Sequence, residues 1–591
     1  MKFLKKITST LTNAKFSFHR FPIVMVSALL SAFFFSLAID NDGMGNDRDL
    51  NAILGYVFLS GIFIYSFVAL LSEGLIHNAK DREDVKHYRM FIILAYLLSI
   101  PLVYILYDLI YEETGGYLPY QNKYIFFGIL FSLAIGCTYI SKIFYHKDFV
   151  PFVVKIIQSF LTAMVYSLIL YAGISGIIFA LVHLFGLDLS ITIYSKMALF
   201  TFIPFFVGIF LSSFPKVNES LMDYRYGKPV SVLLVYLMLP IHLVYLVILF
   251  LYFAKIIIMQ ELPEGIIVNL ILWYGLVATF FNFFLSHIKG HKMIDLFRRI
   301  FSIVMLPILA MMFFAIFLRV KEYGLTENRY FVIIGGCWIL LSCLYYIFYR
   351  KNSNIVIPIV LSLLILVSST GPLSAYHLSA RSQNRKFIKI LQQNSMINGN
   401  QIIPKSEISK EDKKNLTGII EYMNRHHRKH ELSYLPKDFE MSDENMREVF
   451  GFDPYYGRDD NHLIYYTDQN FSIDISGYKK MIRVDSMSRH DGKTEFGAYQ
   501  VYQEGSHIII DYVLEDQEIQ LADINIKEVE DKLRTLKNTV SIINPEDLAI
   551  KGESGGINYK IIFTEINIYS ETQKNDNTFY AAFYLLTDRE D

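Results

Sequence analysis

The chain has 591 residues, of which 53% are hydrophobic, 15% aromatic and only 19% charged. A soluble protein carries about 25% charged residues on average. Here the apolar excess lies almost entirely before Pro372, in runs long enough to cross a bilayer. This pattern excludes a soluble enzyme, a fibrous chain and a disordered chain. The formal net charge of −1 conceals an asymmetry, because residues 1–372 carry about +8 and residues 373–591 about −9.

Eleven segments before Pro372 have the roughly 20 mostly apolar residues that a spanning helix needs. They are residues 22–39, 51–74, 90–110, 123–141, 153–185, 191–213, 230–258, 266–286, 301–318, 330–348 and 354–371. The fifth and seventh are long enough to require a tilt or a break, and Gly173, Gly176 and Pro240 are candidate kink sites. No small-residue cleavage site follows the first run, so we interpret it as a retained helix and not as a signal peptide.

Lys and Arg are distributed unequally between the two sides of this bundle. The N-terminal stretch and every second loop hold about 20 of them, whereas the opposite loops hold about four. We therefore expect a cytoplasmic N-terminus and, with an odd number of spans, an extracytoplasmic C-terminus. The predicted organisation is a basic cytoplasmic segment (1–21), a helical bundle (22–372) and an extracytoplasmic α+β domain (373–591).

The region after Pro372 has mixed secondary-structure signals. Helical spacing predicts helices at 374–395, 408–425 and 526–536. Alternating β-type runs predict strands at Leu463–Thr467, Phe471–Ile475, Gly497–Gln503, His507–Leu514, Ile557–Tyr569 and Thr578–Thr587. About 200 residues are enough to bury a separate core.

The first outer loop is rich in carboxylates that Ca²⁺ or another hard cation would favour: Asp40, Asp42, Asp47 and Asp49. The run resembles the start of an EF-hand loop, but Met44 stands where an oxygen ligand belongs and Asn51 replaces the bidentate Glu. A solvated acidic turn is the simpler interpretation. A divalent cation bound at this loop is the alternative, and we expect no other cofactor.

The outer loop at 319–329 breaks the positive-inside pattern with Arg319, Lys321 and Arg329. Gly324 is expected to end the ninth helix, and Thr326 to cap the tenth. These roles do not account for the three cations. We expect them to serve as an anion site for lipid phosphates or as a docking site for the acidic C-terminal domain.

Two histidine positions have alternative interpretations. His242 falls near the middle of its helix, two residues after Pro240, where it is either a packing residue or a proton relay. His426 and His430 have an i,i+4 spacing that suits a metal, but flanking cations favour an ordinary basic helix end.

The sequence contains no Walker A, G-x-S-x-G, H-E-x-x-H or dinucleotide fingerprint. Several segments resemble a family of bacterial polytopic membrane proteins known as domain of unknown function 4153. They are Arg20-Phe21-Pro22, Tyr252–Lys255 with Glu261–Gly265, Tyr323–Tyr330, and Gly371–Ser374 with Ser379, Ser382 and Gln383. The resemblance covers residues 15–395 and implies a multi-pass protein of the bacterial cytoplasmic (inner) membrane. It implies no catalytic residues.

Three functions remain open at this point. The preferred one is a non-catalytic envelope protein whose bundle anchors an outward-facing binding or sensing domain. The alternatives are a transporter or flippase, and a membrane transferase that acts on lipid-linked substrates with metal bound at the first outer loop. The expected partners are membrane lipids and an envelope protein or lipid-linked molecule, and not nucleic acid.

Overall fold

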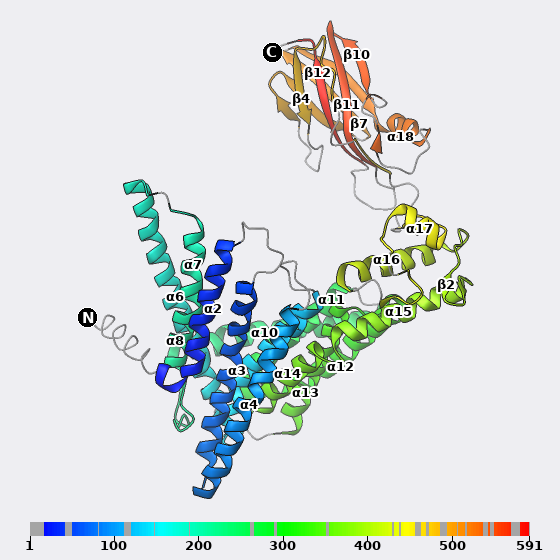
Figure 1. The fold of residues 1–591 in the computed structure, drawn as a ribbon. Coiled ribbons are helices and arrows are strands. Elements are labelled where there is room, and N and C mark those ends of the chain that lie inside the picture. Colours follow the sequence, from blue (N-terminus) through cyan, green and yellow to red (C-terminus); the bar gives the residue numbers. More distant parts are fainter. Residues whose placement is uncertain are drawn as a thin grey trace. The chain divides into compact units, whose positions relative to one another are not determined.

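The computed structural model describes residues 17–41, 50–80, 82–111, 120–146, 148–187, 189–259, 265–288, 292–349, 354–427, 431–436, 439–455, 463–467, 472–484, 493–504, 506–514, 517–535, 542–543, 546, 549–568 and 579–589. The chain forms two compact units, which are drawn in Figure 1. The first contains Met1–Ile408 and Gly418–Phe452, and the second Ser409–Thr417 and Asp453–Asp591. The first unit thus extends past the predicted boundary at Pro372, and independent folding of residues 373–591 stays a prediction.

Ten helices in the described part of the first unit are long and apolar enough to cross a membrane. Eight are single helices: α2 (Pro22–Asn41), α3 (Leu50–Asn78), α4 (Arg82–Tyr111), α5 (Tyr120–Tyr139), α6 (Phe149–Phe185), α11 (Gly265–Leu285), α12 (Lys292–Tyr323) and α13 (Glu327–Phe348). Two are composite: α7 (Thr192–Phe200) with α8 (Phe206–Ser212), and α9 (Lys228–Val232) with α10 (Leu239–Met259). Together with the β-sheets described below, they confirm the predicted fold class, a polytopic helical protein with a C-terminal α+β region.

The eleventh predicted span corresponds to α14 (Val356–Ser369), which has only 14 residues. At 1.5 Å per residue it is about 21 Å long, whereas the hydrocarbon core of a bilayer is about 30 Å thick. The helix packs against α5 and α13. The count of eleven crossings therefore depends on this short helix.

The expected helix breaks are only partly present. Helix α6 runs without interruption from Phe149 to Phe185, through the candidate kink sites Gly173 and Gly176. A Cβ at either glycine would meet nothing within 4 Å, which means that neither marks a close helix contact. The seventh span does change geometry, because the π-helical segment Leu233–Met238 lies just before Pro240. A second π-helical segment, Thr201–Phe205, contains Pro204 and joins α7 to α8.

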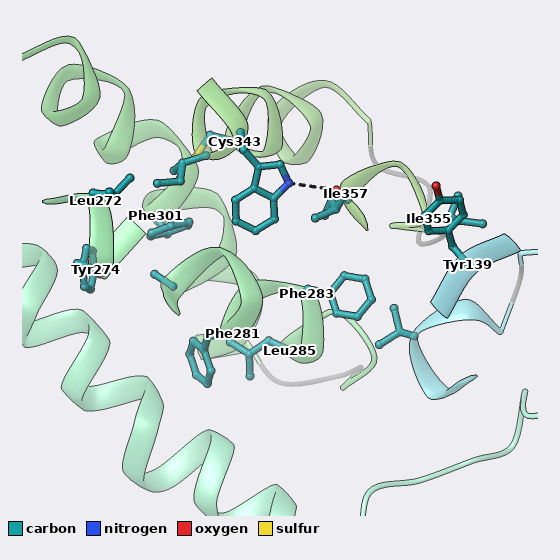
Figure 2. Packing of buried hydrophobic residues seen from close by; sticks show 14 of the residues in the cluster. Tyr139, Leu272, Tyr274, Phe281, Phe283, Leu285, Phe301, Cys343, Ile355 and Ile357 are labelled. Atoms are coloured by element: carbon teal, nitrogen blue, oxygen red, sulfur yellow. Dashed lines mark hydrogen bonds between the residues drawn. The ribbon is translucent and has the colours of Figure 1, made fainter. Parts of the chain in front are cut away.

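The core of the bundle is formed mainly by aromatic and aliphatic side chains of α11, α12 and α13 (Figure 2). Trp338 is 1% exposed, and its indole Nε1 donates a hydrogen bond of 3.1 Å to the carbonyl of Ile357. This bond fixes the start of α14 against α13. Because a buried indole N–H needs a partner, the contact also satisfies the polar end of a large apolar side chain.

A fully buried ion pair joins two connections at one end of the bundle. The ammonium of Lys142 lies 3.1 Å from Oδ1 of Asp148 and donates to the carbonyl of Val217 at 3.0 Å. Asp148 also accepts a hydrogen bond from the backbone N–H of Leu221 at 3.1 Å. The two charged side chains are 0% and 1% exposed. The pair therefore holds the α5–α6 connection against the segment between α8 and α9.

Replacing Asp148 with Asn should lower the free energy of unfolding by about 3–5 kcal/mol, since it leaves the buried Lys142 without a counter-charge. Thermal unfolding in detergent measures the change. The matched control is Glu219→Gln, which breaks the exposed pair with Lys155 and should cost less than about 1 kcal/mol. Equal losses in the two variants would contradict a special role for burial.

The remainder of the first unit follows α14. It contains α15 (Ala375–Gln393), the short hairpin β1 (Ile397–Asn398) and β2 (Gln401–Ile402), the end of α16 (Lys410–His426), and α17 (Asp443–Phe450). Helices α15 and α16 confirm the two helices predicted after Pro372. Phe387 of α15 and Phe450 of α17 are fully buried and make an edge contact.

The second unit contains two β-sheets in its described residues. One has the order β4-β12-β11-β3-β9, with β10 also paired to β11; the other has the order β5-β6-β7-β8. The strands are β3 (Leu463–Thr467), β4 (Lys480–Val484), β5 (Thr494–Phe496), β6 (Tyr499–Glu504), β7 (His507–Leu514), β8 (Gln517–Asn525), β9 (Ile542–Ile543), β10 (Ile550–Ser554), β11 (Ile557–Ile568) and β12 (Phe579–Thr587). All pairs are antiparallel except β3–β9.

Side chains of both sheets share one hydrophobic core, so the sheets pack face to face. The predicted helix at 526–536 is α18 (Ile526–Thr535). The strand predicted at Phe471–Ile475 is wrong, because residues 472–475 form no strand. Strands β4 and β8 were not predicted. Their charged and polar residues obscure the alternation of apolar and polar side chains that is expected of a strand buried on one face.

Candidate functional site

The connection between α12 and α13 is a tight turn of three residues. Helix α12 ends at Tyr323, and Gly324 follows with a φ of +77°. This left-handed conformation is the usual end of a helix and favours glycine. Thr326 occupies the N-cap position of α13 with extended backbone, but its side chain makes no capping hydrogen bond.

Helix α15 clamps this turn through its polar face. Ser382 Oγ accepts a hydrogen bond of 2.9 Å from the backbone N–H of Leu325. Gln383 Nε2 donates to the carbonyls of Tyr323 and Leu325, at 3.2 Å and 3.0 Å. The structure thereby brings together two segments that carry the family resemblance, Tyr323–Tyr330 and the segment that begins at Gly371.

Replacing Gly324 with Ala should destabilise the clamp by about 1–3 kcal/mol, because a Cβ would lie 2.8 Å from Gln383 Nε2 in addition to the left-handed strain. Gly371→Ala is the matched control: its φ is +74°, but a Cβ there meets nothing within 4 Å. Both variants carry the strain of the left-handed backbone, but only Gly324→Ala adds the close contact with Gln383. Thermal unfolding of both variants therefore separates these two costs. If both lose the same stability, the close contact with Gln383 has no energetic role.

A buried group of ionisable side chains lies at the first residue of α13. His427 Nε2 lies 2.7 Å from Oε1 of Glu327, and its Nδ1 lies 3.6 Å from Oε2 of Glu431. Tyr422 donates a hydrogen bond to the other oxygen of Glu327, and Tyr376 donates one of 2.9 Å to Glu431. We call these five residues the Glu327–His427 centre.

The centre is almost closed to solvent. The side chain of His427 is 0% exposed and that of Glu327 is 8% exposed. The ring of Tyr376 covers the imidazole at a centroid distance of 4.3 Å. Glu327 also begins a helix, where the dipole favours a negative charge. A carboxylate at this position can therefore remain ionised and hold a histidinium.

The electrostatics of the centre favour the charged imidazole. Burial alone would lower the pKa of His427, but the adjacent carboxylates of Glu327 and Glu431 outweigh it and raise the pKa above the ordinary value of 6.5. The phenol of Tyr422 has a strongly raised pKa because of burial and the neighbouring Glu327 carboxylate. Tyr422 therefore keeps its proton and donates a hydrogen bond, and the centre favours the charged form of His427.

The three predicted cations belong to the end of α12 and the first turn of α13. The guanidinium of Arg329 donates to the carbonyl of Gly324 at 2.5 Å and lies 5.6 Å from the ring centroid of Tyr323. Lys386 of α15 lies 5.7 Å from the same centroid. Lys321 lies in the last turn of α12 and is exposed, and Arg319 lies one turn before the last residue of the helix. Their roles as an anion or docking site remain predictions.

His242 is buried in the bundle beside aromatic rings. Its ring centroid lies 4.5 Å from that of Phe281 and 5.8 Å from that of Tyr274. The phenol of Tyr274 donates to the backbone carbonyl of His242 at 2.9 Å, so the backbone at this position is tied to α11. These contacts are those of a packing residue.

The structure describes only part of the two segments that were considered for metal binding. Asp40 forms an ion pair with Lys196, while Asp42, Asp47 and Asp49 lie outside the described residues. His426 ends α16, and His430 also lies outside them. Within the described ranges, no group of three or more His, Cys, Asp or Glu side chains could hold a metal ion.

Sequence reasoning did not identify the Glu327–His427 centre. His427 stands in a run of cations that looks like a solvated helix end, and only its i,i+4 spacing to Glu431 was available as a local signal. Tyr422 contacts a carboxylate 95 residues earlier in the chain. A contact between residues so far apart in the chain leaves no periodic pattern in the sequence.

Comparisons with known proteins identify the family of the chain. The family described as Domain of unknown function (DUF4153) matches residues 89–396, which include the α12–α13 turn and its clamp. An uncharacterised protein of Pasteurella multocida (strain Pm70) is 25% identical over 225 residues, or 37% of this chain and 38% of that protein. The alignment thus spans well under half of the relative's length. No solved structure matches the chain significantly. Because the family match covers more than half of the sequence, the chain belongs to the DUF4153 family of multi-pass membrane proteins.

Proposed function

We propose that the protein is a non-catalytic component of the bacterial cytoplasmic membrane whose helical bundle anchors an outward-facing binding or sensing region. The N-terminus is cytoplasmic in this proposal, and the second unit is extracytoplasmic. The distribution of Lys and Arg among the connections supports this orientation.

The observation that carries the proposal is the Glu327–His427 centre. It joins the segment at 422–431 to the first residue of a spanning helix through charged and hydrogen-bonded contacts that are nearly closed to solvent. A segment held in this way transmits a displacement to α13, whereas a segment on a flexible tether does not. The centre therefore suits a protein in which a region after the bundle reports to the bundle.

Cysteine accessibility tests the orientation. The three native cysteines, Cys137, Cys337 and Cys343, are first replaced with Ala or Ser. Single cysteines are then introduced at the exposed positions Lys551 and Lys216. A membrane-impermeant maleimide applied to intact cells should label Lys551→Cys and leave Lys216→Cys unlabelled until the cells are opened. The reverse labelling would refute the orientation.

A separate experiment tests whether the region after the bundle is coupled to the bundle. A spin label on α13 and a second one in the segment at 439–450 should report a fixed distance in the unaltered protein. Breaking the centre with His427→Gln should broaden that distance distribution. An unchanged distribution would show that the centre does not control the attachment.

The π-helical segments favour transport as a second candidate function. Two consecutive spans contain them, at Thr201–Phe205 and Leu233–Met238, and His242 lies one turn beyond the latter. Irregular segments of this kind are frequent at functional sites in helices. If the bundle transports a solute or flips a lipid, His242→Gln should reduce flux in proteoliposomes more than it reduces thermal stability.

A further inference from the structure

Helices α13 and α14 border a pocket of about 370 Å³. One wall is the last part of α13 and the residue after it, from Leu341 to Tyr349, and the other is the first turns of α14, from Val356 to Val360. Apart from one serine and two tyrosines, the lining side chains are aliphatic or phenylalanine. Pockets that hold small ligands measure about 300–1,000 Å³. The pocket thus has the size and the chemistry of a site for a hydrocarbon group.

The pocket exists because α14 begins part of the way along α13. The indole of Trp338 holds the carbonyl of Ile357, the second residue of α14, at 3.1 Å (Figure 2). Helix α13 continues from Trp338 to Phe348, which is about 15 Å along its axis. The last turns of α13 therefore extend past the start of α14, and α14 does not cover them completely.

The pocket is open at the surface of the bundle. On its rim, Leu341 is 47%, Phe348 80% and Val356 40% exposed. Residues 350–353, which join the two walls, lie outside the described residues, and all four have polar or charged side chains. This segment supplies no apolar side chain to fill the pocket, so an apolar occupant comes from outside the chain.

The surroundings of the pocket are the hydrocarbon layer of the membrane. Helix α13 is about 33 Å long and α14 about 21 Å, whereas the layer is about 30 Å thick. The part of α13 that α14 leaves uncovered therefore faces acyl chains. Tyr345 and Tyr349 stack at the end of α13 with a centroid distance of 5.3 Å, as tyrosines do where hydrocarbon meets headgroups.

We propose that one acyl chain of a membrane phospholipid occupies this pocket and lies between α13 and α14. A second copy of the chain fits less well, because nine residues line the pocket and a stable protein interface takes about 20–30 residues a side. The inference goes beyond the proposed function and holds for either orientation. The lipid completes the packing of α13, the helix that begins at Glu327.

The chain contains its own reporter for this proposal, since it has only two tryptophans. Trp273 is 66% exposed, and Trp273→Phe removes its signal. Trp338 is 1% exposed and contacts the pocket wall at Ile357. The full chain with Trp273→Phe is reconstituted in phosphatidylcholine with or without bromine on an acyl chain. Because bromine quenches fluorescence only at short range, we expect the brominated lipid to quench Trp338 despite its burial.

A pair of matched variants locates the quenching lipid. Val356→Phe puts a larger side chain into the pocket and should remove most of the quenching, as should Leu341→Phe on the other wall. Val277→Phe is the control: Val277 is 49% exposed on α11, which also contacts Trp338 through Phe280, at 5.1 Å between ring centroids. Circular dichroism checks that each variant folds. Equal quenching in the control and both pocket variants would refute the pocket as the binding site.

Two further arms identify the occupant. Brominated stearic acid in an unbrominated bilayer tests a free fatty acid, and quenching by this acid alone would overturn the phospholipid assignment. Quenching that appears only after the protein is diluted in the bilayer would assign the pocket to a second copy of the chain. The absence of quenching under every condition would refute the proposal, and none of these outcomes changes the maleimide-labelling result.

Discussion

Replacing Glu327 with Gln is expected to lower the free energy of unfolding of the first unit by about 3–5 kcal/mol, the cost of removing one member of a buried charged pair. Three contacts change together. His427 loses its nearest carboxylate at 2.7 Å, Tyr422 keeps only a neutral acceptor, and α13 loses a negative charge at its N-terminus. Thermal unfolding in detergent should show the loss.

Hydrogen exchange should show which part of the first unit is destabilised by Glu327→Gln. Amides of the segment at 418–427 should exchange faster in Glu327→Gln, because the contacts that hold the segment are weakened, while amides in the middle of α12 should be unaffected. Glu322→Gln serves as the control: it removes an exposed carboxylate from the same connection and should change stability by less than about 0.5 kcal/mol. A uniform increase in exchange over the whole unit would indicate global destabilisation and contradict a local attachment.

Stability of the first unit should fall as the pH rises through and above neutrality. The folded protein raises the pKa of His427 above 6.5, so it binds the proton more tightly than the unfolded chain does. The resulting stabilisation is fully present below the unfolded pKa and disappears as the pH rises through the folded pKa. Unfolding temperatures measured from pH 6 to pH 9 should show the decrease.

The expected pH dependence arises from His427 and from the groups that contact its ring. The groups that contact it are Glu327 of α13, Glu431, Tyr422 of α16 and Tyr376 of α15. His427→Gln should remove most of the pH dependence in this window, whereas His183→Gln, at an exposed position on α6, should leave it in place. A persistent pH dependence in His427→Gln would assign the effect to another group.

The outcome of each sequence prediction depends on its physical basis. Several predictions that rest on one continuous segment are confirmed, among them ten apolar helices and the helices α15 and α16, whereas the strand predicted at Phe471–Ile475 is not. Helix α6 continues through Gly173 and Gly176, because a long apolar helix tolerates glycines that lie on an open face. Strand β8 was missed because half of its residues face away from the core.

The sequence by itself determined that this is a polytopic membrane protein with a more polar C-terminal α+β region. Apolar runs and periodicity are properties of neighbouring residues, and a bilayer or a core imposes them locally. Only the tertiary structure decided that Gln383 clamps Gly324 and that His427 meets Glu327. Those contacts join residues far apart in the chain, and their stability comes from burial and mutual charge, neither of which exists before the helices pack.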